Sequence, residues 1–301
     1  MAMNLPGYEL EKQVGMGAGS RIYRAVETTT GKRFAVKRVV KNRQSDERFF
    51  AQVENEFAVS SQIDHPNLRH SHLLHRVRKR FQVREMFLIM DYIDGLPIEI
   101  ARPNRLNTFL NIFRKVTFGL DAMHEAGHIH SDIKPNNIMF GRGGVVKIID
   151  FGQSCPIGHR KARVQGTPDF IAPEQVRRLS LDRRTDVYNL GATMYWVLTS
   201  EKFPTIMRAE GEPDGRAFIT VDEPIAPIEL NDRIPLALSN LVMECCEDHP
   251  SERPADMTQV RARIEKIQER WVKHCDEERS KLRATQPTSD EQNPSATEEV
   301  E

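Results

Sequence analysis

A glycine-rich segment near the start of the chain has the composition of a loop that could bind phosphate. It reads GMGAGSRI, at residues 15–22, and stands between two runs of β-forming residues. Because glycine has no side chain, such a backbone can pass close to a phosphate and direct its N–H groups at it. An ordinary hairpin turn between two strands is the alternative interpretation of the same segment.

A lysine on the next β-rich run is a second candidate for binding an anion. Lys37 ends the apolar string Ala35-Val36-Lys37, and a lysine that points inward from an apolar strand needs an anionic partner. Glu56 is the candidate carboxylate, because helical spacing places it on the same face as Phe49 and Val53. The two residues could form a purely structural ion pair, or Lys37 could be shared between Glu56 and the phosphates of a nucleotide.

Two strings in the middle of the chain concentrate carboxylate, ammonium and amide side chains. They are HSDIKPNN, at residues 130–137, and DFG, at residues 150–152, which follows the apolar run 145–149. Together with the glycine-rich segment, Lys37 and the string GTPDFIAPE at residues 166–174, they resemble in order and spacing the motifs of eukaryotic-like serine/threonine protein kinases of the bacterial type. The resemblance covers residues 8–271. Two residues depart from the family pattern, because Ser20 stands at the third glycine position and Ser131 stands at the position of the catalytic-loop arginine.

The resemblance implies a role for each residue of these motifs. Asp132 would orient the substrate hydroxyl or accept its proton, and Lys134 would neutralise the transferred phosphoryl group. Asn137 and Asp150 would hold Mg²⁺ through side-chain oxygens, which are the ligands that a hard cation prefers. The residues that would bind ATP are Val14, Gly15, Met16, Gly17, Ala18, Gly19, Ser20, Ile22, Ala35, Lys37, Glu56, Met90, Asp91 and Ile93.

Within this set, the resemblance also implies how adenine would be held. Met90 would face the back of the adenine pocket, and the backbone of Asp91 and Ile93 would bond the adenine edge. Three further residues match structural positions of the family: Glu174 would pair with Arg253, and Asp186 would brace the catalytic loop.

The segment between Asp150 and Glu174 is where many members of the family accept an activating phosphate. Ser154 and Thr167 are its only serine or threonine residues, and Thr167 matches a threonine that contacts the catalytic aspartate and lysine. Ser131 cannot form the charge-assisted pair with a phosphate that an arginine would form. We therefore hypothesise an activity that does not require phosphorylation of this segment. The basic string HRKAR, at residues 159–163, is interpreted as a solvated loop, with a phosphate or acidic substrates as alternative ligands.

The elements that would position these residues fall into two groups. Runs at 8–14, 20–27, 33–40, 73–81 and 86–92 predict strands, and 45–63 predicts a helix with Ser45 as its N-cap. After Gly95 the apolar spacing is helical, along residues 106–123 and again along 187–198, and two more helices are predicted at 235–246 and 255–271. The predicted fold class is therefore α+β: the bilobed protein kinase fold, with a β-rich N-terminal lobe and a mainly helical C-terminal lobe.

The predicted lobes span residues 1–94 and 95–271, with a hinge near residues 91–95. Residues 272–301 are predicted to form a disordered acidic tail, since the end of the chain is rich in Pro, Ser, Thr and Glu and poor in apolar residues. Arg76, Arg78 and Arg80 alternate along a predicted strand, which favours a solvated face over a nucleic-acid site.

Bulk composition narrows the functional classes further. Lys+Arg and Asp+Glu are both 43, so the chain has no general attraction to nucleic acid or anionic membranes. No apolar run approaches the ~20 residues that span a bilayer, and the start of the chain lacks the features of a signal peptide, so we expect a cytoplasmic protein. The 4 cysteines are interpreted as reduced structural thiols, with a metal or redox site as the alternative.

The function that the resemblance implies is transfer of the γ-phosphoryl group of ATP to serine or threonine hydroxyls of protein substrates. ATP and Mg²⁺ would be the cofactors, no nucleic-acid partner is expected, and the oligomeric state is left open. One alternative is a catalytically inactive scaffold on the kinase fold, which Ser20 and Ser131 would suggest. Another is a phosphotransferase for small molecules, which residues 166–174 disfavour, because a small substrate needs no docking platform for a protein.

Overall fold

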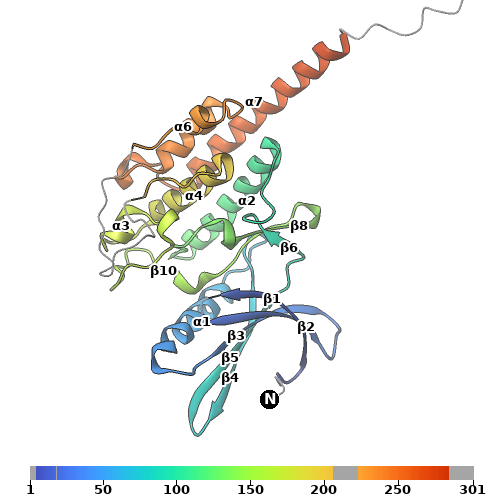
Figure 1. Cartoon of the computed structure of the whole chain (residues 1–301), viewed down its shortest axis with the longest axis vertical. Helices are drawn as coiled ribbons and strands as arrows, with labels where there is room; N and C mark the ends of the chain where they lie inside the picture. The colour runs from blue at the N-terminus through green and yellow to red at the C-terminus, as the bar shows by residue number, and fades with distance from the viewer. Residues whose placement is uncertain (1–4, 18, 206–222, 285–301) are drawn as a thin grey trace, which may run out of the picture.

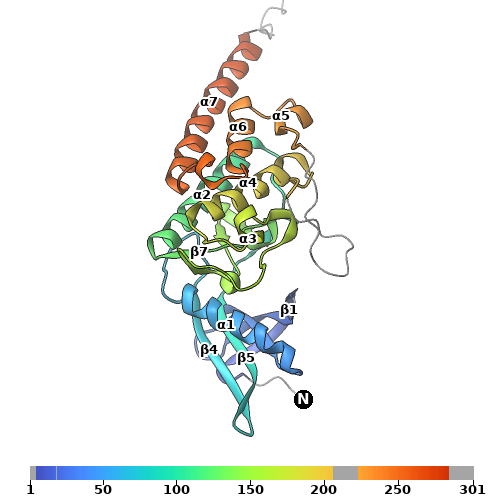
Figure 2. The ribbon, with the colours of Figure 1, turned by 90° about the vertical axis from the view of Figure 1, so that its left-hand side faces the viewer.

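The computed structural model describes residues 5–17, 19–205 and 223–284 of the chain. These residues form a β-rich lobe and a helical lobe that are joined near residues 91–95, and the helix α7 extends away from the helical lobe (Figures 1 and 2). The expected α+β fold with two lobes is confirmed.

Five antiparallel strands form the sheet of the N-terminal lobe, in the spatial order β1-β2-β3-β5-β4. The strand predicted at 73–81 is too long at its end, because Arg80 and Phe81 make the turn into β5 with φ values of 49° and 67°. Arg80 therefore lies in a turn, whereas Arg76 and Arg78 are exposed on β4. The strands are β1 (Tyr8–Gly17), β2 (Ser20–Glu27), β3 (Arg33–Val40), β4 (Ser71–Lys79) and β5 (Gln82–Asp91).

The helix α1 (Glu47–Ser60) packs against this sheet, after a 3₁₀ turn at Gln44–Asp46. Its residues Val53 and Glu56 are buried, as their helical spacing predicts. The prediction of Ser45 as the N-cap is wrong, because Asp46 occupies that position. Its carboxylate accepts the backbone N–H groups of Asn42 and Arg43, each at 2.9 Å, which closes the 3₁₀ turn before α1 begins.

Helices build the C-terminal lobe around one large apolar core. The predicted stripe along α2 is buried from Phe109 to Met123. In α4, Gly191 permits close packing, since a Cβ there would lie 2.6 Å from the Cβ of Cys245 on α6. The helices are α2 (Leu106–Glu125), α3 (Pro173–Val176), α4 (Arg183–Thr199), α5 (Pro227–Leu230), α6 (Leu236–Cys245) and α7 (Met257–Ala284).

Two short ladders bring the chemically important strings of the sequence together beneath the sheet. One has the order β6-β8-β9 and the other pairs β7 with β10. Short 3₁₀ turns at Pro135–Asn137 and Phe151–Gln153 follow these strands and carry the ends of the two strings. The strands are β6 (Gly95–Pro97), β7 (His128–Ile129), β8 (Ile138–Gly141), β9 (Val146–Ile148) and β10 (Cys155–Pro156).

The helix α7 corrects the predicted boundary of the tail. It continues past Trp271 to Ala284, so residues 272–284 are helical. Ion pairs at i,i+3 spacing, Asp276–Arg279 and Glu278–Lys281, lie on its exposed end, where such pairs stabilise a helix without an apolar face. The disorder predicted for 285–301 falls outside the described residues. Within the described part of the chain, no helix combines the length and apolar character needed to cross a membrane.

All four cysteines are free thiols. Cys155, Cys245 and Cys246 are buried, and burial raises the pKa of Cys155 to about 11 and that of Cys245 to about 12. These thiols therefore stay protonated at neutral pH, as expected of structural cysteines rather than reactive ones.

Candidate active site

A cleft of about 830 Å³ lies between the sheet of the N-terminal lobe and the loops of the C-terminal lobe. This volume is within the range of sites that bind small molecules and cofactors. Most residues predicted from the sequence line it: Val14, Gly15, Met16, Gly17, Ser20, Ile22, Ala35, Lys37, Asp91, Ile93, Asp132, Lys134, Asn137 and Asp150.

Three of the predicted residues do not line this cleft, and a fourth lies outside the described residues. Met90 is fully buried behind its wall, where it pairs in register with Ala35. Glu56 reaches the cleft only through its contact with Lys37. Gly19 turns away with φ of 78°, and a Cβ there would lie 2.5 Å from the ring of Phe49. Ala18 lies outside the described residues.

The connection between the lobes offers a backbone donor to the cleft. The N–H of Asp91 donates to the carbonyl of His70, and the carbonyl of Ile93 accepts from the N–H of Gly95, both at 3.0 Å. The N–H of Ile93 has no hydrogen-bond partner among the described residues. Of the backbone groups predicted to bond adenine, the N–H of Ile93 is thus open to a ligand, and the N–H of Asp91 is not.

Lys37 joins two carboxylates at the back of the cleft. Its Nζ lies 2.6 Å from Oε2 of Glu56 and 3.2 Å from Oδ1 of Asp150. Burial lowers the pKa of Lys37, but the charges of Asp150 and Glu56 outweigh it, so the net pKa is raised. The Lys37 charge in turn holds the pKa of Asp150 well below its usual value. Lys37 and Asp150 are therefore ionised at neutral pH.

The backbone at Asp150 is strained in a way that directs its carboxylate. Its φ of 64° and ψ of 74° lie in the left-handed region, which costs a non-glycine residue about 1–2 kcal/mol. The carboxylate remains 42% exposed toward the cleft. Strain of this kind gathers at functional sites, where the surroundings impose it.

Two residues that the sequence analysis missed hold α1 against this centre. Arg69 is buried, and its guanidinium lies 3.0 Å from Oε1 of Glu56, so this carboxylate serves two cations. The side-chain amide of Asn55 lies 2.8–3.3 Å from the carbonyls of Phe151, Gly152 and Ser154. Both contacts join segments that are remote in sequence, so no local pattern marks them.

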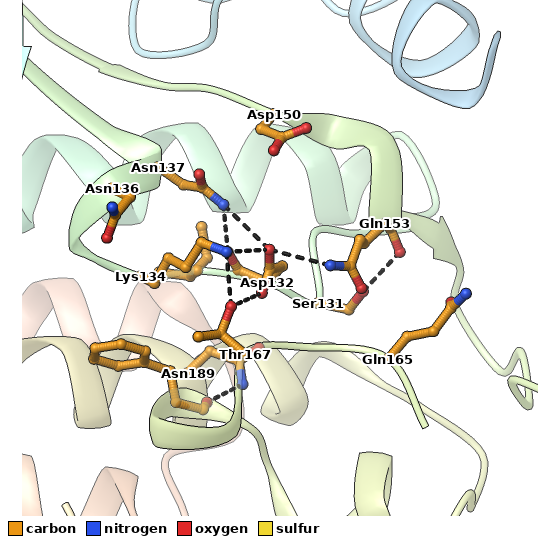
Figure 3. A network of polar contacts seen from close by, with 12 residues as sticks. Ser131, Asp132, Lys134, Asn136, Asn137, Asp150, Gln153, Gln165, Thr167 and Asn189 are labelled. Carbon is orange, nitrogen blue, oxygen red and sulfur yellow. Dashed lines mark hydrogen bonds and ion pairs between the residues drawn. The ribbon is translucent and has the colours of Figure 1, made fainter. Parts of the chain in front are cut away.

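The second centre surrounds Asp132, which is 5% exposed (Figure 3). Its Oδ2 accepts from Lys134 Nζ at 2.9 Å, and its Oδ1 accepts from Thr167 Oγ1 at 2.9 Å. Lys134 Nζ also donates to Thr167 Oγ1 at 2.7 Å. The predicted contact of Thr167 with the aspartate and the lysine is confirmed. Gln153, a residue that the sequence analysis missed, donates to Oδ2 of Asp132 at 3.3 Å.

Two buried carboxylates have the structural roles expected from the sequence. Asp186 accepts the backbone N–H groups of His130 and Ser131 at 2.9 and 2.7 Å. Glu174 and Arg253 form a buried bidentate pair at 2.8 and 2.9 Å. Both structural predictions are confirmed.

The donor set between the two centres fits a hard cation. The amide nitrogen of Asn137 donates to the carbonyl of Asp132 at 2.8 Å. Figure 3 shows that its amide oxygen points away from Asp132, on the side where Asp150 lies. One carboxylate, one amide oxygen and the phosphates of a nucleotide form the kind of ligand set that Mg²⁺ uses. No group of three or more His, Cys, Asp or Glu side chains suited to a metal occurs in the described ranges.

The basic string at residues 159–163 is only partly solvated, which corrects the prediction. His159, Arg160 and Arg163 are exposed, but Lys161 is 7% exposed. Its Nζ donates to Oγ of Ser131 and to the carbonyl of Gln153, each at 2.7 Å. Lys161 is therefore buried inside the protein, whereas the neighbouring cations Arg160 and Arg163 face the solvent.

Comparison with known proteins agrees with this geometry. Residues 8–266 match the family model described as protein kinase domain. The chain is 25% identical over 296 residues to a probable serine/threonine-protein kinase of Clostridium acetobutylicum, covering 95% of this chain and 44% of the relative. It is 29% identical to serine/threonine-protein kinase A of Synechocystis sp., over 87% of this chain and 53% of the relative. It is 30% identical to a probable serine/threonine-protein kinase of Corynebacterium efficiens, over 86% and 41%. The chain thus spans about half the length of these relatives or less.

Proposed function

Because this chain belongs to the protein kinase domain family, we propose that it transfers the γ-phosphoryl group of ATP to serine or threonine hydroxyls of proteins. The observation that carries the proposal is the joint presence of two assembled centres on one cleft. One is the Lys37–Glu56–Asp150 triad, and the other is Asp132 with Lys134 and Thr167.

The cleft suits a nucleotide in size and in the arrangement of its walls. Val14, Ile22 and Ala35 supply apolar surface for a flat purine, and the open N–H of Ile93 would bond its edge. The glycine-rich end of β1 would cover the phosphates, and Lys37 would pair with them while Glu56 keeps it in place.

Asp150 and Asn137 would hold Mg²⁺ between the phosphates and the catalytic loop. When bound, the cation would neutralise charge that develops on the phosphate oxygens. The low pKa of Asp150 suits this role, because its carboxylate is ionised without any cost at neutral pH.

Asp132 would receive the substrate hydroxyl. Its two oxygens are oriented by Thr167 and Lys134, so the carboxylate is fixed before a substrate arrives. Lys134 would stay beside the transferred phosphoryl group and offset its charge. Serine and threonine are the proposed acceptors because the string DIKPN follows the form of serine/threonine kinases, and because the relatives carry that name.

Neither departure from the family pattern removes a group that this chemistry needs. Ser20 lies on β2 beside the cleft, where its backbone N–H remains. Ser131 has its own partners in Lys161 and Gln153. An inactive scaffold is therefore not favoured by any contact at these two residues. We also propose that this part of the protein works in the cytoplasm, because that is where ATP is available.

The proposal is tested with purified enzyme, labelled ATP, Mg²⁺ and a general protein substrate, followed by analysis of which amino acids carry the label. Label on serine or threonine, lost in the Lys37→Met variant, is the expected result. Label on tyrosine alone, or transfer that survives Lys37→Met, would contradict it.

A further inference from the structure

Lys161 is a buried cation whose partners are neutral. It belongs to the segment between Asp150 and Glu174, and among the described residues its Nζ has two hydrogen-bond partners, Ser131 Oγ and the Gln153 carbonyl. No carboxylate lies within ion-pair distance of it in the described part of the chain. Burial lowers the pKa of Lys161, and the charges of Asp132 and Asp186 offset this only in part.

Such a lysine is not explained by folding stability. An ammonium group loses its hydration on burial, and two neutral acceptors restore less than a carboxylate would. An apolar side chain of similar length would fill the same space without that cost. The reason for a lysine here must therefore lie in what the ammonium holds.

The two residues that Lys161 holds both border Asp132. Ser131 precedes Asp132 in the chain, with φ of 59°, and its other polar groups are already bound by Asp186 and Gln175. Gln153 contacts the Asp132 carboxylate through its own side chain. Lys161 therefore ties its own part of the segment, residues 159–167, to two residues that border Asp132.

The hydroxyl groups of this segment could not serve the same purpose through a phosphate. Ser154 is 6% exposed, and Thr167 is bonded to Asp132 and Lys134. They are the only serine or threonine residues between residues 150 and 174. If this segment is anchored by one of its own groups, that group must therefore be an unmodified side chain. Lys161 is the buried cation of the basic string at residues 159–163.

We propose that Lys161 is a positioning residue that docks residues 159–167 of this segment onto Ser131 and Gln153, and so holds Asp132 and Thr167 in working geometry without a phosphate on the segment. This inference rests on the proposed kinase function for its catalytic consequence, but the docking itself does not. Lys161 touches no substrate, and it acts through Ser131 and Gln153.

The test compares Lys161→Met with Arg160→Met, both in phosphatase-treated enzyme. Arg160 is the adjacent exposed cation, and it contacts only the carbonyl of Arg178. We expect Lys161→Met to lower kcat roughly 10- to 100-fold, as misplacement of a catalytic group does, with the KM for ATP changed less than about twofold. Backbone hydrogen exchange in residues 162–167 should rise about tenfold or more in the same variant. Arg160→Met should leave kcat, KM and exchange unchanged.

Three outcomes would overturn the inference. They are wild-type kcat in Lys161→Met, unchanged exchange in residues 162–167, or loss of wild-type activity on phosphatase treatment alone. Should Lys161→Met fail to fold, Ser131→Ala decides, since it removes one acceptor of the ammonium together with the bond from the Ser131 hydroxyl to the Gln153 carbonyl. It should lower kcat several-fold and raise the same exchange, and no change in either would refute the proposal.

The exchange measurement also separates this inference from the proposed function. If the wild-type enzyme transferred no phosphate, the kinase proposal would fail. Raised exchange in Lys161→Met would still support the docking role, and unchanged exchange would still refute it.

Discussion

Replacing Asp132 with asparagine should separate the chemical step from folding and nucleotide binding. The carboxylate accepts from Lys134 at Oδ2 and from Thr167 at Oδ1. The ammonium of Lys134 can only donate hydrogen bonds, so the side-chain oxygen of an asparagine would face it. The NH₂ group of the asparagine would then face Thr167. The hydroxyl of Thr167 can accept this bond, so the side chain fits without a steric conflict.

The expected loss follows from the role of the carboxylate. An amide cannot take a proton from the substrate hydroxyl, and general-base assistance of this kind contributes about 10²–10⁴-fold. This corresponds to about 3–5 kcal/mol in the activation free energy. The KM for ATP should change less than about twofold, because the role proposed for Asp132 is to bind the substrate hydroxyl and not the purine or the phosphates.

The assay is steady-state phosphorylation of a protein substrate, with ATP affinity and urea unfolding measured on the same preparations. Asp121→Asn is the matched control, since it makes the same chemical change on α2, where Asp121 pairs with Arg261 at 3.0 Å. Wild-type turnover in Asp132→Asn would refute the assignment. An equal loss of turnover in both variants would show that the effect is not specific to the site.

Four further outcomes are expected from the contacts described above. Asp150→Ala should abolish Mg²⁺-dependent phosphoryl transfer, while nucleotide binding measured without Mg²⁺ persists, because the cation loses its carboxylate. Met90→Gly should open the cleft behind Ala35, so that the folded variant gains use of ATP analogues with bulky N6 substituents. Arg253→Met should reduce the free energy of unfolding in urea by about 3–5 kcal/mol, because it leaves Glu174 buried without its cation. The control Arg177→Met removes an exposed pair with Asp248 and should reduce the free energy of unfolding by less than about 1 kcal/mol. Asn55→Ala should leave buried carbonyls unpaired, with a loss of about 1–3 kcal/mol in urea unfolding and a lower kcat at an unchanged oligomeric state.

Much of the architecture was predictable, because periodicity reports which face of an element is buried. The spacing of Val53 and Glu56 predicted that both lie on the buried face of α1. The position of Lys37 on an apolar strand then predicted an anionic partner nearby, which is Glu56. The stripe along α2 was predictable for the same reason. The contact of Thr167 with Asp132 was predicted from the resemblance to the kinase family, not from periodicity.

Element ends were less predictable, because they depend on local competition between polar groups. Asp46 captures two preceding N–H groups and displaces Ser45 from the N-cap. The last turns of α7 contain few apolar residues and therefore resemble a tail. Their Lys, Arg and Glu residues favour helix nevertheless, and ion pairs at i,i+3 spacing support it.

The residues that hold the loop after Asp150 were not predictable for a different reason. Asn55 reaches the carbonyls of Phe151, Gly152 and Ser154 from α1, and Lys161 reaches the carbonyl of Gln153 from the opposite segment. The carbonyls of residues 151–154 therefore all have a hydrogen-bond donor from outside this loop. Three of the donor contacts come from Asn55 in the N-terminal lobe, and the contact with Gln153 comes from Lys161 in the C-terminal lobe.

A backbone carbonyl accepts equally well from an amide, an ammonium or a hydroxyl group. The chemistry of phosphoryl transfer demands particular side-chain types at Lys37, Asp132 and Asp150, and that demand produces a recognisable string. Holding a carbonyl demands only a donor at the right place in space, so it leaves no string behind. For this reason the sequence gives no sign that Lys161 is buried while Arg160 and Arg163 are exposed, and its contacts with Ser131 and Gln153 are found only in the folded chain.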